Sequence, residues 1–364
     1  MSKKYISTHY SEYLKLQQLL SAQEPRSKED GNVAHDEMLF IIVHQVYELW
    51  FKQIIHELNS VMQLFRNDTV DEHNIGIAVS RLDRVIEIMK LLIEQIRVME
   101  TLTPLDFLDF RNYLFPASGF QSYQFRIVEV MLGLRQEKRI TYNNQPYTAP
   151  FTTDQRTQLE AIESGDTLMK VIEDWLERIP FLNFRDFDFL KHYRSAVEAM
   201  LQREKQAILN TDFLSEEEKQ MRLRMMGDTD TYFQSILDKD VHQQLVNEGK
   251  IQLSYKATLA ALLINLYRDE PILHQPYTLL VKLIDLDEHL TTWRYRHAQM
   301  VLRMLGKKVG TGGSSGHEYL RETAVRHHIF LDFHNIATLL IPRSELPPLP
   351  PHLKQELGFN YSSK

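Results

Sequence analysis

Apolar residues recur at three- and four-residue steps along much of the chain, and this spacing predicts long amphipathic helices. The clearest stretches are residues 36–64, 79–99 and 286–305. The segment SRLDRVIEIMKLLIEQIRVM (80–99) contains no proline or glycine, as is typical of bundle helices. Alternating strand patterns are scarce, and RITYNNQPYTAP (139–150) indicates a loop or a short hairpin. The patterning therefore predicts an all-α helical bundle.

Breaks in this pattern divide the chain into parts. We expect an N-terminal segment (1–30), a main helical domain (31–195 and 251–345), an inserted small helical subdomain (196–250) and a proline-rich tail (346–364). The insertion is rich in charge, as in REKQAILNTDFLSEEEKQMRLRMM, and we interpret it as a lid or an insertion on the main bundle. Five prolines between Pro342 and Pro351 predict that the fold ends there and an extended tail begins.

Composition narrows the possible partners. The 364 residues include 42 Lys and Arg against 49 Asp and Glu, and this net charge of −7 lacks the positive field that sequence-independent binding to nucleic acid requires. The chain has no cysteine, which excludes disulfides, thiolate nucleophiles and cysteine-ligated metals. The N-terminus MSKKYISTHYSEYLKL lacks an apolar signal region, and runs such as ATLAALLINLY (257–267) are shorter than a membrane span. We expect a soluble cytoplasmic protein with no nucleic-acid or membrane partner.

Two histidines lie on largely apolar helix faces. His44 shares its predicted face with Phe40, and His297 shares its face with Trp293 and Met300. A single histidine in such a place is typical of a hydrogen-bonded core residue, whereas two of them on bundle helices also allow a metal or haem ligand. The spacing leaves both interpretations open. The Glu-x-x-His pairs of di-iron bundles and the His-Glu-x-x-His of zinc proteases are both absent.

A glycine-rich loop, KKVGTGGSSG (307–316), follows one of the predicted helices. Four of the 13 glycines of the chain lie between Gly310 and Gly316. The loop contains a G-x-S-x-G pattern, but a nucleophile elbow needs a preceding strand, and the lysine of a phosphate-binding loop is missing. Its backbone N–H groups and the hydroxyl of Thr311 suit a small carboxylate. A plain linker is the alternative that remains open.

Arg111 is the third candidate, since it interrupts the aromatic run PLDFLDFRNYLF (104–115). An arginine among aromatic residues is often a surface residue whose stem packs against them. It can also be a buried guanidinium that binds a carboxylate through two parallel hydrogen bonds. The sequence pattern allows either.

Long ordered blocks carry a family resemblance. They are YSEYLKL (10–16), HDEMLFIIVHQVYELWFKQIIHEL (35–58), TPLDFLDFRNYLFPASGFQSYQFR (103–126), LSYKATLAALLINLYRDEP (253–271) and WRYRHAQMVLRMLGKKVGTGGSSGHEYLR (293–321). Through them the chain resembles the tryptophan 2,3-dioxygenases over most of its length, and only weakly between about 135 and 250. The resemblance implies a homotetrameric enzyme with haem b, active as Fe²⁺. With O₂ as co-substrate, it would open the indole ring of L-tryptophan to N-formyl-L-kynurenine, the first step of the kynurenine pathway.

The resemblance also implies roles for individual residues. His297 in WRYRH is similar to the axial ligand of the haem iron, and His44 in IIVHQ to the catalytic distal histidine that orients the indole N–H. Arg111 in DFRNYL is similar to the residue that pairs with the substrate carboxylate, and Thr311 to a loop residue that contacts the ammonium and carboxylate groups. The other implied contacts are Phe40 and Phe107 at the indole, Ser118 and Gly119 beside the haem, and Tyr10, Tyr13 and Leu14 reaching a neighbouring subunit's site.

Two positions refine this expectation. The family has Tyr or Phe at position 107, and because Phe107 lacks a hydroxyl, the carboxylate should depend more on Arg111 and Thr311. The presence of His44 favours this family over the related indoleamine dioxygenases, which lack a distal histidine, and favours selectivity for L-tryptophan. The alternatives are a haem-dependent oxygenase of the same superfamily that acts on another indole or aromatic compound, and a non-catalytic helical interaction protein.

Overall fold

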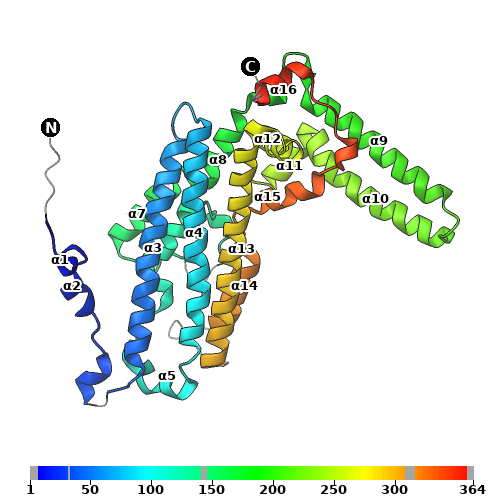
Figure 1. Ribbon diagram of the computed structural model, residues 1–364. Helices are drawn as coiled ribbons and strands as arrows, with labels where there is room; N and C mark the ends of the chain where they lie inside the picture. Colours follow the sequence, from blue (N-terminus) through cyan, green and yellow to red (C-terminus); the bar gives the residue numbers. More distant parts are fainter. Residues whose placement is uncertain (1–6, 32, 141–145, 307, 309–315, 359–364) are drawn as a thin grey trace.

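The computed structural model of the chain is built almost entirely of helices, which confirms the all-α prediction (Figure 1). It describes residues 7–31, 33–140, 146–306, 308 and 316–358. The α-helices are α1 (Tyr10–Tyr13), α2 (Leu16–Leu20), α3 (Glu37–Phe65), α4 (Glu72–Met99), α5 (Pro104–Arg111), α6 (Tyr123–Leu132), α7 (Thr153–Glu163), α8 (Leu168–Glu177), α9 (Phe189–Asn210), α10 (Glu216–Leu237), α11 (Lys239–Asn247), α12 (Tyr255–Leu266), α13 (Pro271–Leu305), α14 (Gly316–Arg326), α15 (Leu331–Asn335) and α16 (Pro351–Leu357).

Short elements connect these helices. The 3₁₀ helices are η1 (Arg26–Asp30), η2 (Asn112–Leu114), η3 (Gly119–Gln121), η4 (Gln136–Lys138), η5 (Pro180–Leu182), η6 (Ile336–Leu339) and η7 (Arg343–Glu345). Within the described residues, the sheet consists of two antiparallel strands of two residues each, β1 (Asn183–Phe184) and β2 (Phe187–Asp188).

Three long helices, α3, α4 and α13, run side by side and form the body of the bundle (Figure 1). All three lie where the apolar spacing predicts helices, but α13 begins at Pro271 rather than near residue 286. Pro276 lies inside this helix, and a proline at such a position predicts a break because it lacks the N–H and crowds the preceding turn. The helix continues through Pro276, so α13 is 35 residues long and extends past His297 to Leu305.

Local sequence signals set the ends of the smaller helices near His297. The α5 helix begins with a capping box, in which Thr103 and Asp106 satisfy each other's backbone N–H groups, and with Pro104 in the first turn. The α6 helix ends at Gly133, whose φ of +111° favours glycine. A Cβ atom at this position would lie 2.8 Å from the Cβ of Met169, so a larger residue does not fit there.

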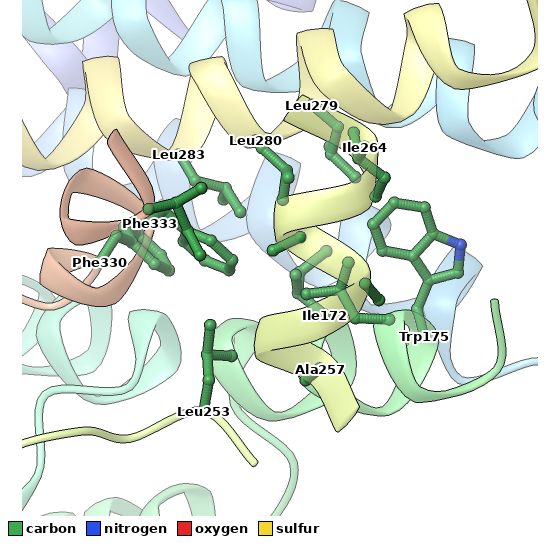
Figure 2. Close-up of a cluster of buried hydrophobic side chains, with 14 of the residues drawn as sticks. Ile172, Trp175, Leu253, Ala257, Ile264, Leu279, Leu280, Leu283, Phe330 and Phe333 are labelled. Atoms are coloured by element: carbon green, nitrogen blue, oxygen red, sulfur yellow. The ribbon is translucent and has the colours of Figure 1, made fainter. Parts of the chain in front are cut away.

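The main core lies in the half of the bundle that carries α8 and α12. Figure 2 shows apolar side chains from α8, α12, α13 and α15 meeting around α12. Helix α12 is apolar on all sides, with buried residues at nearly every position, as expected of a helix surrounded by others. A second, smaller buried cluster of Val43, Met99, Leu102, Phe110 and Met304 lies at the other end, between α3, α4, α5 and α13.

The predicted insertion contains a hairpin of α9 and α10, which projects away from the bundle (Figure 1). The expected boundary at residue 196 falls inside α9, so the hairpin begins earlier, at Phe189. Phe213, between the two helices, is 97% exposed. The expected tail contains α16, where Leu353 and Leu357 are buried, so this part packs against the bundle instead of extending from it.

Among the described residues, α3 is long and apolar enough to cross a membrane by length and composition alone. A core helix of a soluble protein has the same property, and α3 packs against α4 and α6. Only 17% of its most apolar stretch is buried within the single chain. An apolar surface therefore remains on its outer side.

Candidate functional site

A cavity of about 250 Å³ lies at the end of the bundle that carries α5. Its walls come from α3, α5, the segment 114–120, α6, the last turns of α13, and α14. Most of the lining is apolar, with Met99, Met300, Met304 and Leu305 among the aliphatic side chains. An enclosed apolar cavity with a few polar groups is typical of a small-molecule site.

His44 reaches this cavity from α3, and its hydrogen bond fixes its tautomer. The Nδ1 atom lies 2.7 Å from the carbonyl oxygen of Phe40. Because a carbonyl can only accept, Nδ1 carries the hydrogen, and in the neutral ring Nε2 is a hydrogen-bond acceptor. The Phe40 ring lies 4.1 Å from the His44 ring, and Phe107 lies 5.9 Å beyond Phe40. An acceptor nitrogen therefore lies beside aromatic walls.

Burial sets the charge of His44. It lowers the pKa of this imidazole, whereas the Phe40 carbonyl and the carboxylate of Glu48 act in the opposite direction. The Glu48 carboxylate is itself held by the Ser122 hydroxyl at 2.6 Å and by the Gln124 amide at 2.9 Å. The net effect keeps His44 neutral at pH 7, since its pKa lies below the ordinary value of 6.5.

His297 enters the same cavity from α13. Burial and the proximity of His44 lower its pKa to about 4, so this ring is also neutral at pH 7. Its Nδ1 atom is enclosed by protein atoms and makes no hydrogen bond within the described part of the chain. Nε2 is thus the nitrogen available to a ligand in the cavity. Trp293, one turn earlier, stacks on the imidazole with the ring centroids 5.4 Å apart.

A buried cluster of charges forms another part of the wall. Glu129 accepts hydrogen bonds from Arg126 at 2.6 Å, Arg139 at 2.9 Å and Arg294 at 2.9 Å. Arg126, Glu129 and Arg294 line the cavity. Arg294 also donates to the carbonyl of His327, which follows α14. Side chains from α6, from the residue after η4 and from α13 thus meet at one carboxylate.

This cluster has more positive than negative charge. Burial alone would raise the pKa of Glu129, but Arg126, His327 and the other arginines hold it well below its usual range. Glu129 is therefore ionised, and three guanidinium groups against one carboxylate leave two positive charges in excess. Nε and Nη2 of Arg139 are buried and make no hydrogen bond to the part of the chain that the structure describes, and this guanidinium lies over the Tyr147 ring at 4.0 Å. Of the three arginines, Arg126 and Arg294 line the cavity, so the excess of positive charge in the cluster favours an anionic group at this wall.

The other expected site residues fall into three groups. Phe40, Phe107, Arg111, Ser118 and Gly119 line the same cavity as the two histidines. Thr311 lies outside the described residues. The third group comprises Tyr10, Tyr13 and Leu14, which belong to or adjoin α1. They are 70%, 75% and 41% exposed and are not among the residues that line the cavity of their own chain.

Several residues of the cavity were not among the expected site residues. They are Met99, Arg126, Glu129, Trp293, Arg294, Met300, Met304 and Tyr319. The spacing of the charged residues could have indicated some of them. Arg126 and Glu129 lie three residues apart on one helix, and Arg294 lies three residues before His297 on another, so each pair shares a helix face. Tyr319 packs edge-on against Phe120 at 5.1 Å and so joins α14 to the wall near Ser118.

Together, the fold and the cavity define a helical-bundle protein whose mostly apolar cavity is lined by two neutral imidazoles and by a cluster of arginines around one carboxylate. A family model described as tryptophan 2,3-dioxygenase matches residues 2–340. The chain belongs to this family.

Curated relatives agree over nearly the whole chain. The tryptophan 2,3-dioxygenase of Bdellovibrio bacteriovorus is 49% identical over 358 residues, which cover 98% of this chain and 100% of the relative. That of Dictyostelium discoideum is 44% identical over 97% of this chain and 89% of its own length. Tryptophan 2,3-dioxygenase B of Danio rerio is 44% identical over 98% of this chain and 86% of its own length.

Proposed function

We propose that this chain is a haem-dependent dioxygenase that inserts both atoms of O₂ across the C2–C3 bond of the indole ring of L-tryptophan. The product is N-formyl-L-kynurenine, and the reaction is the first step of tryptophan degradation by the kynurenine pathway. One observation carries the proposal: in a chain of this family, His44 and His297 line a single apolar cavity.

The residues of the cavity fit haem b. Within the described residues, no three His, Asp or Glu side chains form a metal-ion site. His297 therefore suits a metal that brings its remaining ligands with it, as haem iron does. The two excess positive charges suit the two propionates of haem, with Arg126 and Arg294 at the cavity wall as their partners. Met300 and Leu305 supply apolar surface for the macrocycle.

Haem supplies the oxygen chemistry when it is bound, and the chain supplies orientation and selectivity. The Nε2 atom of His44 accepts the indole N–H, while Phe40 and Phe107 enclose the ring. We treat His44 as an orienting residue rather than an obligatory base, because the indole N–H is a very weak acid. An analogue without this N–H leaves the His44 acceptor unpaired once the ligand has displaced water from the cavity, which lowers its affinity.

The polar end of tryptophan requires a different set of groups. Arg111 lines the cavity at the end of α5 and carries the guanidinium that pairs with the substrate carboxylate. Phe107, on the preceding turn, offers no hydroxyl. We assign Thr311 to the ammonium and carboxylate groups from the family resemblance alone.

The assembly we propose is a cytoplasmic homotetramer. Tyr10 and Tyr13 are exposed in the single chain, as expected of side chains that complete the site of a neighbour. The outer side of α3 and α4 carries further exposed apolar residues, among them Ile42, Leu49 and Leu91. Exposed apolar surface of this kind is typical of a surface that another subunit covers.

Reconstitution with haemin tests the proposal. The wild-type protein should take up haem with a ferric Soret band, consume O₂ with L-tryptophan, and discriminate against D-tryptophan. His297→Ala should remove the Soret band of the bound form. His289→Ala is a matched control, because His289 lies on the same helix, bonds the Asp285 carbonyl at 2.7 Å and does not line the cavity. No turnover of L-tryptophan by the haem-loaded protein would refute the proposed substrate.

A further inference from the structure

An aromatic cluster surrounds Trp293 on the side of the cavity that carries His297. The indole of Trp293 and the imidazole of His297 are nearly parallel, with an interplanar angle of 17°. Phe125 of α6 lies 5.0 Å from the indole, and Phe51 of α3 meets it edge-on at 6.3 Å. Tyr47 of α3 lies 6.2 Å away. Trp293 is therefore held by two other helices while it covers one face of the His297 ring.

The position of Tyr47 is itself fixed. Its hydroxyl donates a hydrogen bond of 2.7 Å to the carbonyl oxygen of Leu92 on α4. A continuous set of contacts thus runs from α4 through Tyr47 and Trp293 to His297. Side chains that are locked by packing and by neighbouring hydrogen bonds transmit their orientation to the group that they touch.

The indole N–H of Trp293 adds a second argument. Nε1 is buried and makes no hydrogen bond of normal geometry to the described residues. Burial raises the pKa of the Tyr47 hydroxyl to about 12, and the Trp293 N–H partly offsets this rise. The N–H therefore lies near the Tyr47 hydroxyl, although the two groups do not form a hydrogen bond of normal geometry. A buried N–H without a good acceptor costs free energy that a hydrocarbon side chain would not. The benefit of tryptophan here therefore lies in its large flat ring.

Stacking restricts the rotation of the His297 ring. An imidazole is free to turn about its Cβ–Cγ bond unless a neighbour blocks it. At a centroid distance of 5.4 Å and an interplanar angle of 17°, the two rings make a near-parallel contact that a turned imidazole would lose in exchange for an edge-on one. The stacked contact therefore favours one direction of the Nε2 lone pair before any ligand binds.

We propose that Trp293 is a positioning residue that fixes the ring plane of His297 and thereby the direction and strength of its bond to haem iron. This inference rests on the proposed function, since it requires His297 to be the iron ligand. Trp293 acts through His297, and the contacts of its ring with Phe51 and Phe125 hold it in place.

The test compares Trp293→Phe and Trp293→Leu with the same changes at Trp175. Trp175 on α8 is 5% exposed and packs edge-on against Phe65, but it does not line the cavity. Two quantities are measured: the dissociation constant of haem, and the iron–histidine stretching band of the ferrous protein by resonance Raman. Loss of a residue that supports a metal ligand lowers metal affinity by ~10-fold or more. We expect that loss for Trp293→Leu, together with a shifted and broader band.

The aromatic variant should be partly rescued. Trp293→Phe should bind haem more tightly than Trp293→Leu and show a smaller shift of the band. The Trp175 variants should have a lower melting temperature than the wild type but the same iron–histidine stretching band. If Trp293→Leu does not fold, Trp293→Phe decides, because an unchanged band in that variant overturns the inference.

The outcomes separate the inference from the proposed function. If the wild type binds no haem, or if His297→Ala binds it normally, the proposed function fails. If haem binds through His297 and both Trp293 variants keep the wild-type band and affinity, the inference alone fails. Equal shifts in the Trp175 variants would also overturn it, since the effect would then reflect general loosening of the core.

Discussion

At the scale of single residues, the hydrogen bond from His44 to the carbonyl of Phe40 decides the chemistry of the distal side. It commits Nδ1 as a donor, so Nε2 is an acceptor only while the ring is neutral. Protonation would turn this acceptor into a donor and repel the indole N–H. Burial lowers the pKa of His44, which keeps the acceptor form through neutral pH.

The first prediction concerns pH. The kcat/KM for L-tryptophan should be constant near pH 7 and should fall as the pH drops through the lowered pKa of His44, below 6.5. Glu48 raises this pKa, so Glu48→Gln should lower it further and move the acidic limb to lower pH. A pH profile of both proteins checks this, and an acidic limb that moves to higher pH in the variant would contradict it.

The second prediction concerns Arg111. Arg111→Ala should raise the KM for L-tryptophan and leave haem affinity almost unchanged, because a charge-assisted pair contributes about 2–3 kcal/mol. Arg111→Lys should recover only part of the loss, since an ammonium cannot form two parallel hydrogen bonds to a carboxylate. Steady-state O₂ uptake and haemin titration give the two quantities, and an unchanged KM would refute the role.

At the scale of elements, Glu129 joins the region of α6 and η4 to α13, which is remote in sequence. It lies on α6 and binds side chains from α13 and from the segment after η4, and Arg294 extends the contact to the residue after α14. These contacts fix α6 and α14 against the helix that carries His297. The cluster thus determines both the shape and the charge of the cavity wall.

The third prediction follows from this carboxylate. Glu129→Gln should destabilise the fold by roughly 3–5 kcal/mol at pH 7, because it leaves buried guanidinium groups uncompensated. The pKa of Glu129 lies well below 4.5, so its contribution is fully present above that pH and is lost as the pH falls through the lowered value. Urea denaturation at several pH values measures the difference. Glu87→Gln, in an exposed ion pair, is the control and should change stability by less than about 1 kcal/mol.

The same cluster marks the limit of what could be predicted from the sequence. Apolar spacing predicts α3, α4 and much of α13, and the faces it assigns to His44 and His297 do reach one cavity. Arg294 is far from Glu129 and Arg139 in the chain, and no local pattern indicates that it meets them. The start of α13 was also missed, because Pro276 argues locally for a break whereas tertiary packing holds the helix together.

At the scale of the whole molecule, the single chain has features that remain without a partner. Tyr10, Tyr13 and Leu20 are exposed near the N-terminus, and the most apolar stretch of α3 is largely uncovered. Monomeric proteins rarely expose large continuous apolar patches. The division into domains and the tetramer both remain predictions.

The fourth prediction tests the proposed exchange of residues between subunits. A chain that lacks residues 1–16 should lose activity if Tyr10 and Tyr13 complete a neighbour's site. Co-expression of this truncated chain with Arg111→Ala should restore part of the activity, because the truncated chain keeps Arg111 and the other chain supplies the N-terminal segment. Activity of the purified mixed oligomer is the measurement. A fully active truncated homo-oligomer would show that the segment is dispensable.

The stripe of Phe40, His44, Tyr47 and Phe51 along α3 has a consequence for how such a chain can evolve. The first two residues line the cavity, and the last two contact Trp293, which stacks on His297. Inserting one residue between them would rotate one pair relative to the other by about 100°. A single insertion would thus misalign the pair Phe40 and His44 with the pair Tyr47 and Phe51. Insertions and deletions in α3 should therefore be confined to the two ends of the helix.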